Sequence, residues 1–262
     1  MSTKTIWISA LNKEKDAARV TALSQVLRRY GLQSQGHFWV DEPEKLAWRA
    51  ALDALNAARA DVWLILASPE ELAKPSVRYG LSVLAANLRE ARGTSFPIVV
   101  SWLADAAPEA VPPLLANAAA LDERAAAWAA KMVARANMAG TAVQPEHRFE
   151  VVGEEQLGQW YALSPRQGEW QGVVFGVSGG DARIDFQAVG PRGALPEKTV
   201  LEYAQEGLTV QVGEREFQAW AVRNRIGAEE AYYARVKGCP EAILFMPYTE
   251  SDEAEATVLQ LV

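Results

Sequence analysis

The residues best suited to ligand chemistry are polar side chains at or near the ends of short apolar segments in the N-terminal half. Carboxylates and hydroxyls there can bind the hydroxyl groups of a ribose, and an arginine can hold a phosphate. The candidate ligand-binding residues are Ser9, Asp41, Glu42, Ser68, Glu70, Glu71 and Arg78. No residue is assigned a catalytic role.

The candidates other than Ser9 also have a purely structural interpretation. Ser68-Pro69-Glu70-Glu71 is typical of a helix start, with a capping serine, a proline at the first helical position and acidic residues in the first turn. Asp41 and Glu42 fit solvated loop charges, and Arg78 fits a surface ion pair. The two interpretations of each residue stay open at this point.

Several other kinds of site lack the residues that they need. The chain has one cysteine, Cys239, so it cannot form an intrachain disulfide or a cysteine-rich metal site. Its two histidines, His37 and His147, are far apart in sequence. We therefore predict no metal site and no Ser-His-Asp or Cys-His arrangement.

The candidate residues must be positioned by alternating strands and helices. Apolar runs predict five strands: Thr5–Ala10, Phe38–Val40, Val62–Ala67, Pro97–Trp102 and Ala118–Leu121. Apolar residues at three- and four-residue spacing predict helices between them. This alternation favours a parallel sheet in the order 2-1-3-4-5 with helices on both faces, a flavodoxin-like α/β domain. Ligands of such sheets bind beyond the carboxyl ends of the strands.

In order along residues 4–138, these segments resemble a bacterial TIR (Toll/interleukin-1 receptor) domain. Thr5–Ser9 resembles the first strand of that family, and Phe38–Asp41 resembles the second. Trp48–Leu52 resembles the helix that follows. The most specific match is Ala60–Pro69, followed by Ser76–Leu81.

The resemblance also implies what this chain lacks. In catalytic TIR domains, a glutamate on the third helix holds the nicotinamide ribose while the N-glycosidic bond of NAD is cleaved. The matching position here is Gly80, which offers no carboxylate. The loop after the second strand is expected to be shortened to Asp41–Glu44. In the family this loop shapes the ligand pocket and takes part in assembly.

The pattern changes in the C-terminal half. After a predicted linker at Ala142–Glu150, strands are expected at Gly172–Val177 and Arg183–Val189, joined by a glycine-rich turn. The other predicted elements are a hairpin of Leu208–Val212 and Phe217–Val222, a helix at Ala228–Lys237, a strand at Ala242–Met246 and an edge strand at Thr257–Val262. We predict two domains, residues 1–141 and a β-rich α+β domain of residues 148–262.

Charge is distributed unevenly along the 262 residues, whose net charge is −7. Residues 1–147 contain 16 Lys/Arg and 15 Asp/Glu, a balance of +1; residues 148–262 contain 10 and 18, a balance of −8. This distribution argues against a nucleic-acid partner. No signal peptide or membrane-spanning run is evident, so we expect no membrane partner and a cytoplasmic location.

Two functional hypotheses follow. The first is a non-catalytic TIR-like signalling or scaffold protein, or a protein that binds a nucleotide-derived signal. The alternative is an NAD-consuming or nucleoside-processing N-glycosidase in which Glu70 or Glu71 substitutes for the missing carboxylate. We expect no bound cofactor. The resemblance allows NAD or a nucleotide-derived compound as a ligand. We also expect a protein partner or a second copy of the chain.

Overall fold

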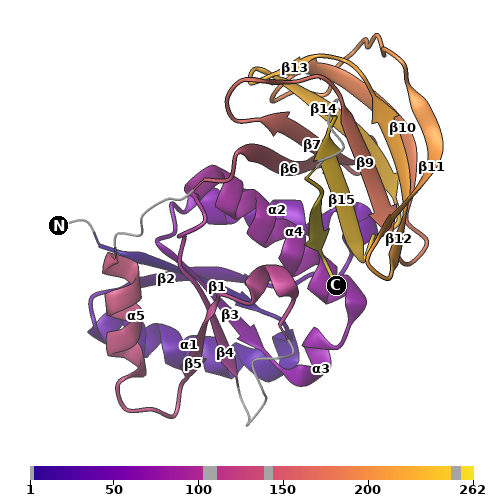
Figure 1. The fold of residues 1–262 in the computed structure, drawn as a ribbon. Coiled ribbons are helices and arrows are strands. Elements are labelled where there is room, and N and C mark those ends of the chain that lie inside the picture. Colours follow the sequence, from indigo (N-terminus) through magenta and orange to yellow (C-terminus); the bar gives the residue numbers. More distant parts are fainter. Residues whose placement is uncertain (1–2, 103–110, 139–143, 249–254) are drawn as a thin grey trace. The chain divides into compact units, whose positions relative to one another are not determined.

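The computed structural model describes residues 3–102, 111–138, 144–248 and 255–262, which form two compact units (Figure 1). The first unit comprises residues 1–43 and 47–143, and the second comprises residues 144–262 together with residues 44–46. The predicted linker lies partly outside the described residues. Its C-terminal part is not a linker, because the first strand of the second unit begins at His147.

Five parallel strands form the sheet of the first unit. They are β1 (Thr5–Ala10), β2 (Gln33–Phe38), β3 (Val62–Ala67), β4 (Ile98–Trp102) and β5 (Ala119–Asp122). Neighbouring strands follow the order β2-β1-β3-β4-β5, and all four pairs are parallel. The predicted parallel sheet and its strand order are confirmed.

The second strand differs from the prediction. We expected it at Phe38–Val40, where the residues are apolar, but it spans Gln33–Phe38 and ends where the prediction began. β2 is an edge strand whose residues are exposed or half-buried, so it needs no apolar run. The connection to the next helix therefore covers residues 39–46, including the short 3-10 helix η1 (Pro43–Lys45), and is longer than predicted.

Helices cover both faces of this sheet. They are α1 (Lys13–Arg29), α2 (Ala47–Ala57), the single turn α3 (Pro69–Leu72), α4 (Pro75–Arg92) and α5 (Trp128–Asn137); η3 (Pro113–Leu115) is a second 3-10 helix. On one face Leu64 packs in a core with Met132 of α5, and on the other Trp63 packs in a core with Leu84 of α4. No helix in the described part of the chain is long and apolar enough to span a membrane.

Antiparallel strands build the second unit. They are β6 (His147–Glu154), β7 (Gly158–Pro165), β8 (Glu169–Trp170), β9 (Val173–Ser178), β10 (Arg183–Pro191), β11 (Gln205–Val212), β12 (Arg215–Val222), β13 (Ile226–Gly227), β14 (Glu230–Lys237), β15 (Ala242–Pro247) and β16 (Thr257–Gln260). Two larger sheets have the orders β10-β14-β7-β6 and β11-β12-β9-β15-β16, and β13 pairs with β8. Aromatic rings from both larger sheets meet in the core: the centroids of Tyr161 and Phe175 are 5.6 Å apart.

The helix predicted at Ala228–Lys237 is wrong. Residues Glu230–Lys237 form strand β14, which lies between β10 and β7. Ala231 to Ala234 are all buried, because packing covers both faces of this central strand. The strand therefore lacks the polar and apolar alternation that would have identified it. Residues 144–248 and 255–262 of the second unit contain no helix, so this part of the chain is all β rather than α+β.

The turns of the second unit partly follow the prediction. β11 and β12 form the expected hairpin around Gly213, whose φ is +59°. β16 is the expected edge strand. The turn after β9 instead leads from one sheet to the other, because β9 pairs with β12 and β15 whereas β10 pairs with β14.

Gly36 of β2 provides a test of the sheet packing. A Cβ atom at this position would lie 2.0 Å from the carbonyl oxygen of Ile8 on β1. Gly36→Ala should therefore lower the free energy of unfolding by about 3 kcal/mol, since the strands must part to accept the methyl group. Urea unfolding of this variant and of Gln35→Ala, an exposed neighbour on the same strand, measures the difference. Equal losses in the two variants would contradict the close approach.

Candidate functional site

The carboxyl edge of the parallel sheet is the place where this fold can build a site. The chain leaves β1 for a helix on one face of the sheet and leaves β3 for helices on the other face. Adjacent parallel strands whose connections diverge in this way create a crevice at their carboxyl ends. The loops that begin at Leu11 and at Ser68 form the two sides of this position.

Asn12 and Glu71 join these two loops. The side-chain oxygen of Asn12 caps α1 by accepting from the backbone N–H of Lys15, and its Nδ2 donates to Glu71 Oε1 at 3.0 Å. Lys74 donates to the other carboxylate oxygen of Glu71 at 2.8 Å. Burial by itself would raise the pKa of Glu71, but the hydrogen bonds from Lys74 and Asn12 outweigh it and hold the pKa below its usual value.

Ser68 and Glu70 have the structural roles that the sequence motif indicates. The Ser68 hydroxyl accepts from the backbone N–H of Glu71 and caps α3, and Pro69 is the first helical residue. Glu70 forms an exposed ion pair with Lys15, and the hydrogen bond from Lys15 to Glu70 raises the pKa of that lysine. The capping interpretation of this segment is therefore confirmed.

A buried network around Arg19 lies at the same edge. The Arg19 Nε donates to both carboxylate oxygens of Glu123 at 3.0 Å, its Nη1 donates to Asp16 at 3.1 Å, and its Nη2 donates to Ser101 at 3.2 Å. The side chains of Arg19 and Asp16 are 8% and 5% exposed. Asp16 also accepts from the backbone N–H of Asn12 at 3.1 Å. The network thus joins α1 to the ends of β1, β4 and β5.

The other candidate residues lie apart from this network. Ser9 is fully buried, and its hydroxyl accepts from the indole N–H of Trp63 at 2.8 Å. Asp41 is exposed and accepts from the Ser76 hydroxyl at 2.9 Å, and Glu42 is exposed in the same loop. Arg78 is half-buried, and burial lowers the pKa of its guanidinium.

Gly80 is covered by an indole ring. A Cβ atom at this buried position of α4 would lie 2.7 Å from Cζ2 of Trp39, the first residue after β2. The ring therefore occupies the space into which a side chain at position 80 would project. Any larger residue there requires Trp39 to move.

The sequence predicts few of the residues that are hydrogen-bonded to one another at this edge. Asn12, Asp16, Arg19, Ser101 and Glu123 were missed. An asparagine directly before a run of helix formers is a capping signal that could have identified Asn12. The other partners carry no such signal, since Arg19 and Glu123 are separated by 104 positions.

A hollow of about 190 Å³ lies between β2 and α1, lined in part by Val20, Ser24 and Phe38. This volume is below the roughly 300–1,000 Å³ of pockets for drug-sized ligands. Within the described residues, no group of three or more His, Cys, Asp or Glu side chains is placed to hold a metal ion.

The chain matches no protein-family model and no curated protein sequence.

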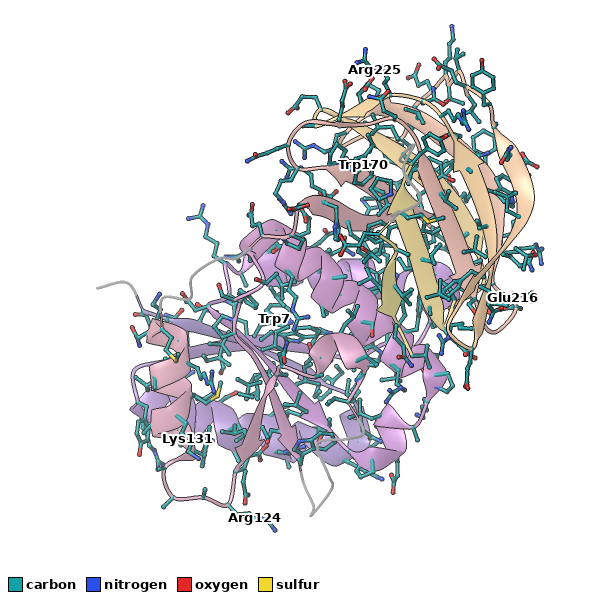
Figure 2. The ribbon with its side chains drawn as sticks, viewed as in Figure 1. Trp7, Arg124, Lys131, Trp170, Glu216 and Arg225 are labelled. Atoms are coloured by element: carbon teal, nitrogen blue, oxygen red, sulfur yellow. The ribbon has the colours of Figure 1, made fainter. Side chains whose placement is uncertain are left out.

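Removal of the buried cation tests the network. Arg19→Met should lower the free energy of unfolding by about 3–5 kcal/mol, because the carboxylates of Asp16 and Glu123 would keep their burial and lose their counter-charge. Arg124→Met is the matched control, since Arg124 forms an exposed ion pair with Asp122 and projects from the surface after β5 (Figure 2). Urea unfolding that shows no larger loss for Arg19→Met would refute the role of the network.

His37 introduces a dependence of stability on pH. Its Nδ1 accepts from the indole N–H of Trp7 at 3.1 Å, and burial lowers the pKa of His37 to about 4. Between pH 7 and pH 5 the unfolded chain, with a pKa near 6.5, takes up a proton that the folded chain does not. The free energy of unfolding therefore decreases as the pH falls. At pH 5 the neutral His37 lowers it by about 2 kcal/mol.

The variant His37→Gln isolates this contribution. A glutamine can still accept from Trp7, but it does not titrate. The variant should lose about 2 kcal/mol less stability than the wild type between pH 7 and pH 5, as measured by urea unfolding at both values. If wild type and variant lose equally, His37 is not held neutral by burial.

Proposed function

We propose that the first unit is a flavodoxin-like, TIR-like module without catalytic activity. In this proposal the chain acts as a signalling or scaffold protein, or recognises a nucleotide-derived signal, and the second unit supplies contacts to partners. The single observation that carries the proposal is the pairing of Gly80 with Trp39. Position 80 has no carboxylate, and an indole fills the space where one would project.

The nearby carboxylates support the same proposal. Glu71 is 7% exposed and receives hydrogen bonds from Asn12 and Lys74. Glu70 is paired with Lys15 and lies in the first turn of α3. A carboxylate that stabilises the positive charge developing on the ribose as nicotinamide leaves must be directed at the sugar. Glu70 and Glu71 are instead occupied by local partners: Glu70 by Lys15, and Glu71 by Asn12 and Lys74.

One observation favours ligand recognition over a purely structural scaffold. Two buried donors, Nε1 of the Trp39 ring that covers Gly80 and Nε2 of His37, have no hydrogen-bond partner among the described residues. The two rings lie 6.0 Å apart. Buried donors without an acceptor are costly, so a ligand with carbonyl or phosphate oxygens would gain from meeting them. Such a ligand would have to displace the Trp39 ring.

The proposal predicts that purified protein releases no nicotinamide from NAD. Loss of an electrostatic contribution of several kcal/mol to the transition state lowers a rate by a factor of hundreds or more. The measurement follows free nicotinamide over time, with a catalytic TIR domain as the positive control. Gly80→Glu should also be inactive, because the side chain at position 80 meets the Trp39 ring.

The opposite outcome has a clear signature. Nicotinamide release by the wild type that disappears in Glu70→Gln or Glu71→Gln would overturn the proposal and favour an N-glycosidase with a substitute carboxylate. Glu90→Gln, a change on α4 away from the loops after β1 and β3, serves as the matched control.

A further inference from the structure

The second unit carries a group of exposed apolar side chains in the connection between β10 and β11. Val200 is 81% exposed and Tyr203 is 79% exposed, the highest values among the large apolar residues that the structure describes. Large apolar groups that gather on a surface are typical of interaction sites. Val200 and Tyr203 are therefore candidates for an interaction surface.

Buried polar contacts hold this connection in place. Asn224 is 8% exposed; its side-chain oxygen accepts from the backbone N–H of Glu202 at 2.9 Å, and its Nδ2 donates to the carbonyl of Val200 at 2.8 Å. Tyr203 has a φ of +47°, a left-handed conformation that is unfavourable for a residue with a side chain. The exposed Tyr203 ring is thus presented by a fixed and locally strained backbone.

Arg223 adds a positive charge at the same place. Its guanidinium lies 4.4 Å from the ring centroid of Tyr248 and 6.0 Å from that of Tyr203. Gly172 allows this approach, because a Cβ there would lie 2.4 Å from the Val222 carbonyl oxygen and 3.1 Å from Cβ of Tyr248. The stacked guanidinium keeps its N–H edge for an anion.

A negative charge lies next to this cation. The backbone N–H of Arg223 donates to the carbonyl of Glu202, so the two residues are neighbours, and the Glu202 side chain is exposed. Neither side chain forms an ion pair with another described residue. The patch of Val200, Glu202, Tyr203, Arg223 and Tyr248 therefore presents both signs of charge beside apolar groups.

We propose that this patch is a self-association surface that binds the same patch on a second copy of the chain. An interface around a twofold axis brings one surface against itself, so it requires a patch that contains both members of each pairing. Arg223 pairs with the partner's Glu202 and Glu202 with the partner's Arg223, while Val200 and Tyr203 pack across the axis. This proposal concerns the second unit and does not depend on the role proposed for the first.

Sedimentation of the full chain tests the proposal. It should be done near 0.15 M salt, where the Debye length of about 8 Å screens the repulsion between two acidic units. The wild type should form dimers in a concentration-dependent manner. Arg223→Glu and Glu202→Arg should each raise the dimer dissociation constant at least about tenfold by placing like charges in contact. The double variant should restore the wild-type dissociation constant to within about threefold, since its charges are complementary again.

Controls separate this interface from general surface effects. Glu214→Arg changes an exposed carboxylate on the turn between β11 and β12, and Leu157→Ser removes an exposed apolar side chain outside the patch. Both should dimerise like the wild type. Tyr203→Ser keeps the stack of Arg223 on Tyr248 and should weaken the dimer, with far-UV circular dichroism to show that each variant is folded.

The following results would overturn the proposal. They are a wild type that is monomeric at every concentration, a dimer that neither charge reversal weakens, and a folded double variant that does not recover association. If the patch binds a different protein instead, the wild type would be monomeric at every concentration.

Discussion

The buried cation of Arg19 is the interaction on which the carboxyl edge of the parallel sheet depends. Asp16 and Glu123 are withdrawn from solvent, and a carboxylate in that position is tolerated only when a counter-charge and hydrogen-bond donors accompany it. One guanidinium supplies both, and it also donates to Ser101 at the end of β4. The carboxyl ends of β1, β4 and β5 are therefore held together around a single side chain.

This arrangement explains why polar residues at the edge serve the fold. Asp16 accepts from the backbone at Asn12, Asn12 donates to Glu71, and Glu71 receives Lys74. Each of these groups is hydrogen-bonded to the next, so the charged groups have partners within the protein. The sheet offers the usual location for a ligand, and among the described residues of this edge these side chains form a connected internal network.

The position of Trp39 follows from where β2 ends. Because the edge strand stops at Phe38, Trp39 opens the next connection, and its indole lies on α4 at Gly80. Glycine at position 80 and tryptophan at position 39 are therefore complementary, since a side chain at either place limits the other. Of the predicted strand Phe38–Val40, Phe38 is the last residue of β2 and Trp39 fills the space over α4.

Apolar patterning located four strands of the first unit, because β1 and β3 to β5 lie inside the sheet or pair along an apolar core. It failed at β2, an edge strand with polar residues, and at β14, a central strand covered on both faces. At β2 the apolar residues lie at and after the end of the strand, and at β14 the apolar residues reflect burial on both faces. The cap formed by Ser68 was readable because its signal lies within four consecutive residues.

By itself the sequence determined the alternation of elements, the order of the parallel strands, the turn at Gly213 and the lack of a carboxylate at position 80. The elements, the turn and the missing carboxylate follow from residue type or from spacings of a few residues, and the strand order follows from the right-handed crossovers that alternating strands and helices require. Only the tertiary structure decided that Arg19 meets Glu123, that Trp39 covers Gly80 and that Arg223 stacks on Tyr248. These contacts join positions 25 to 104 residues apart, and they depend on how whole elements pack.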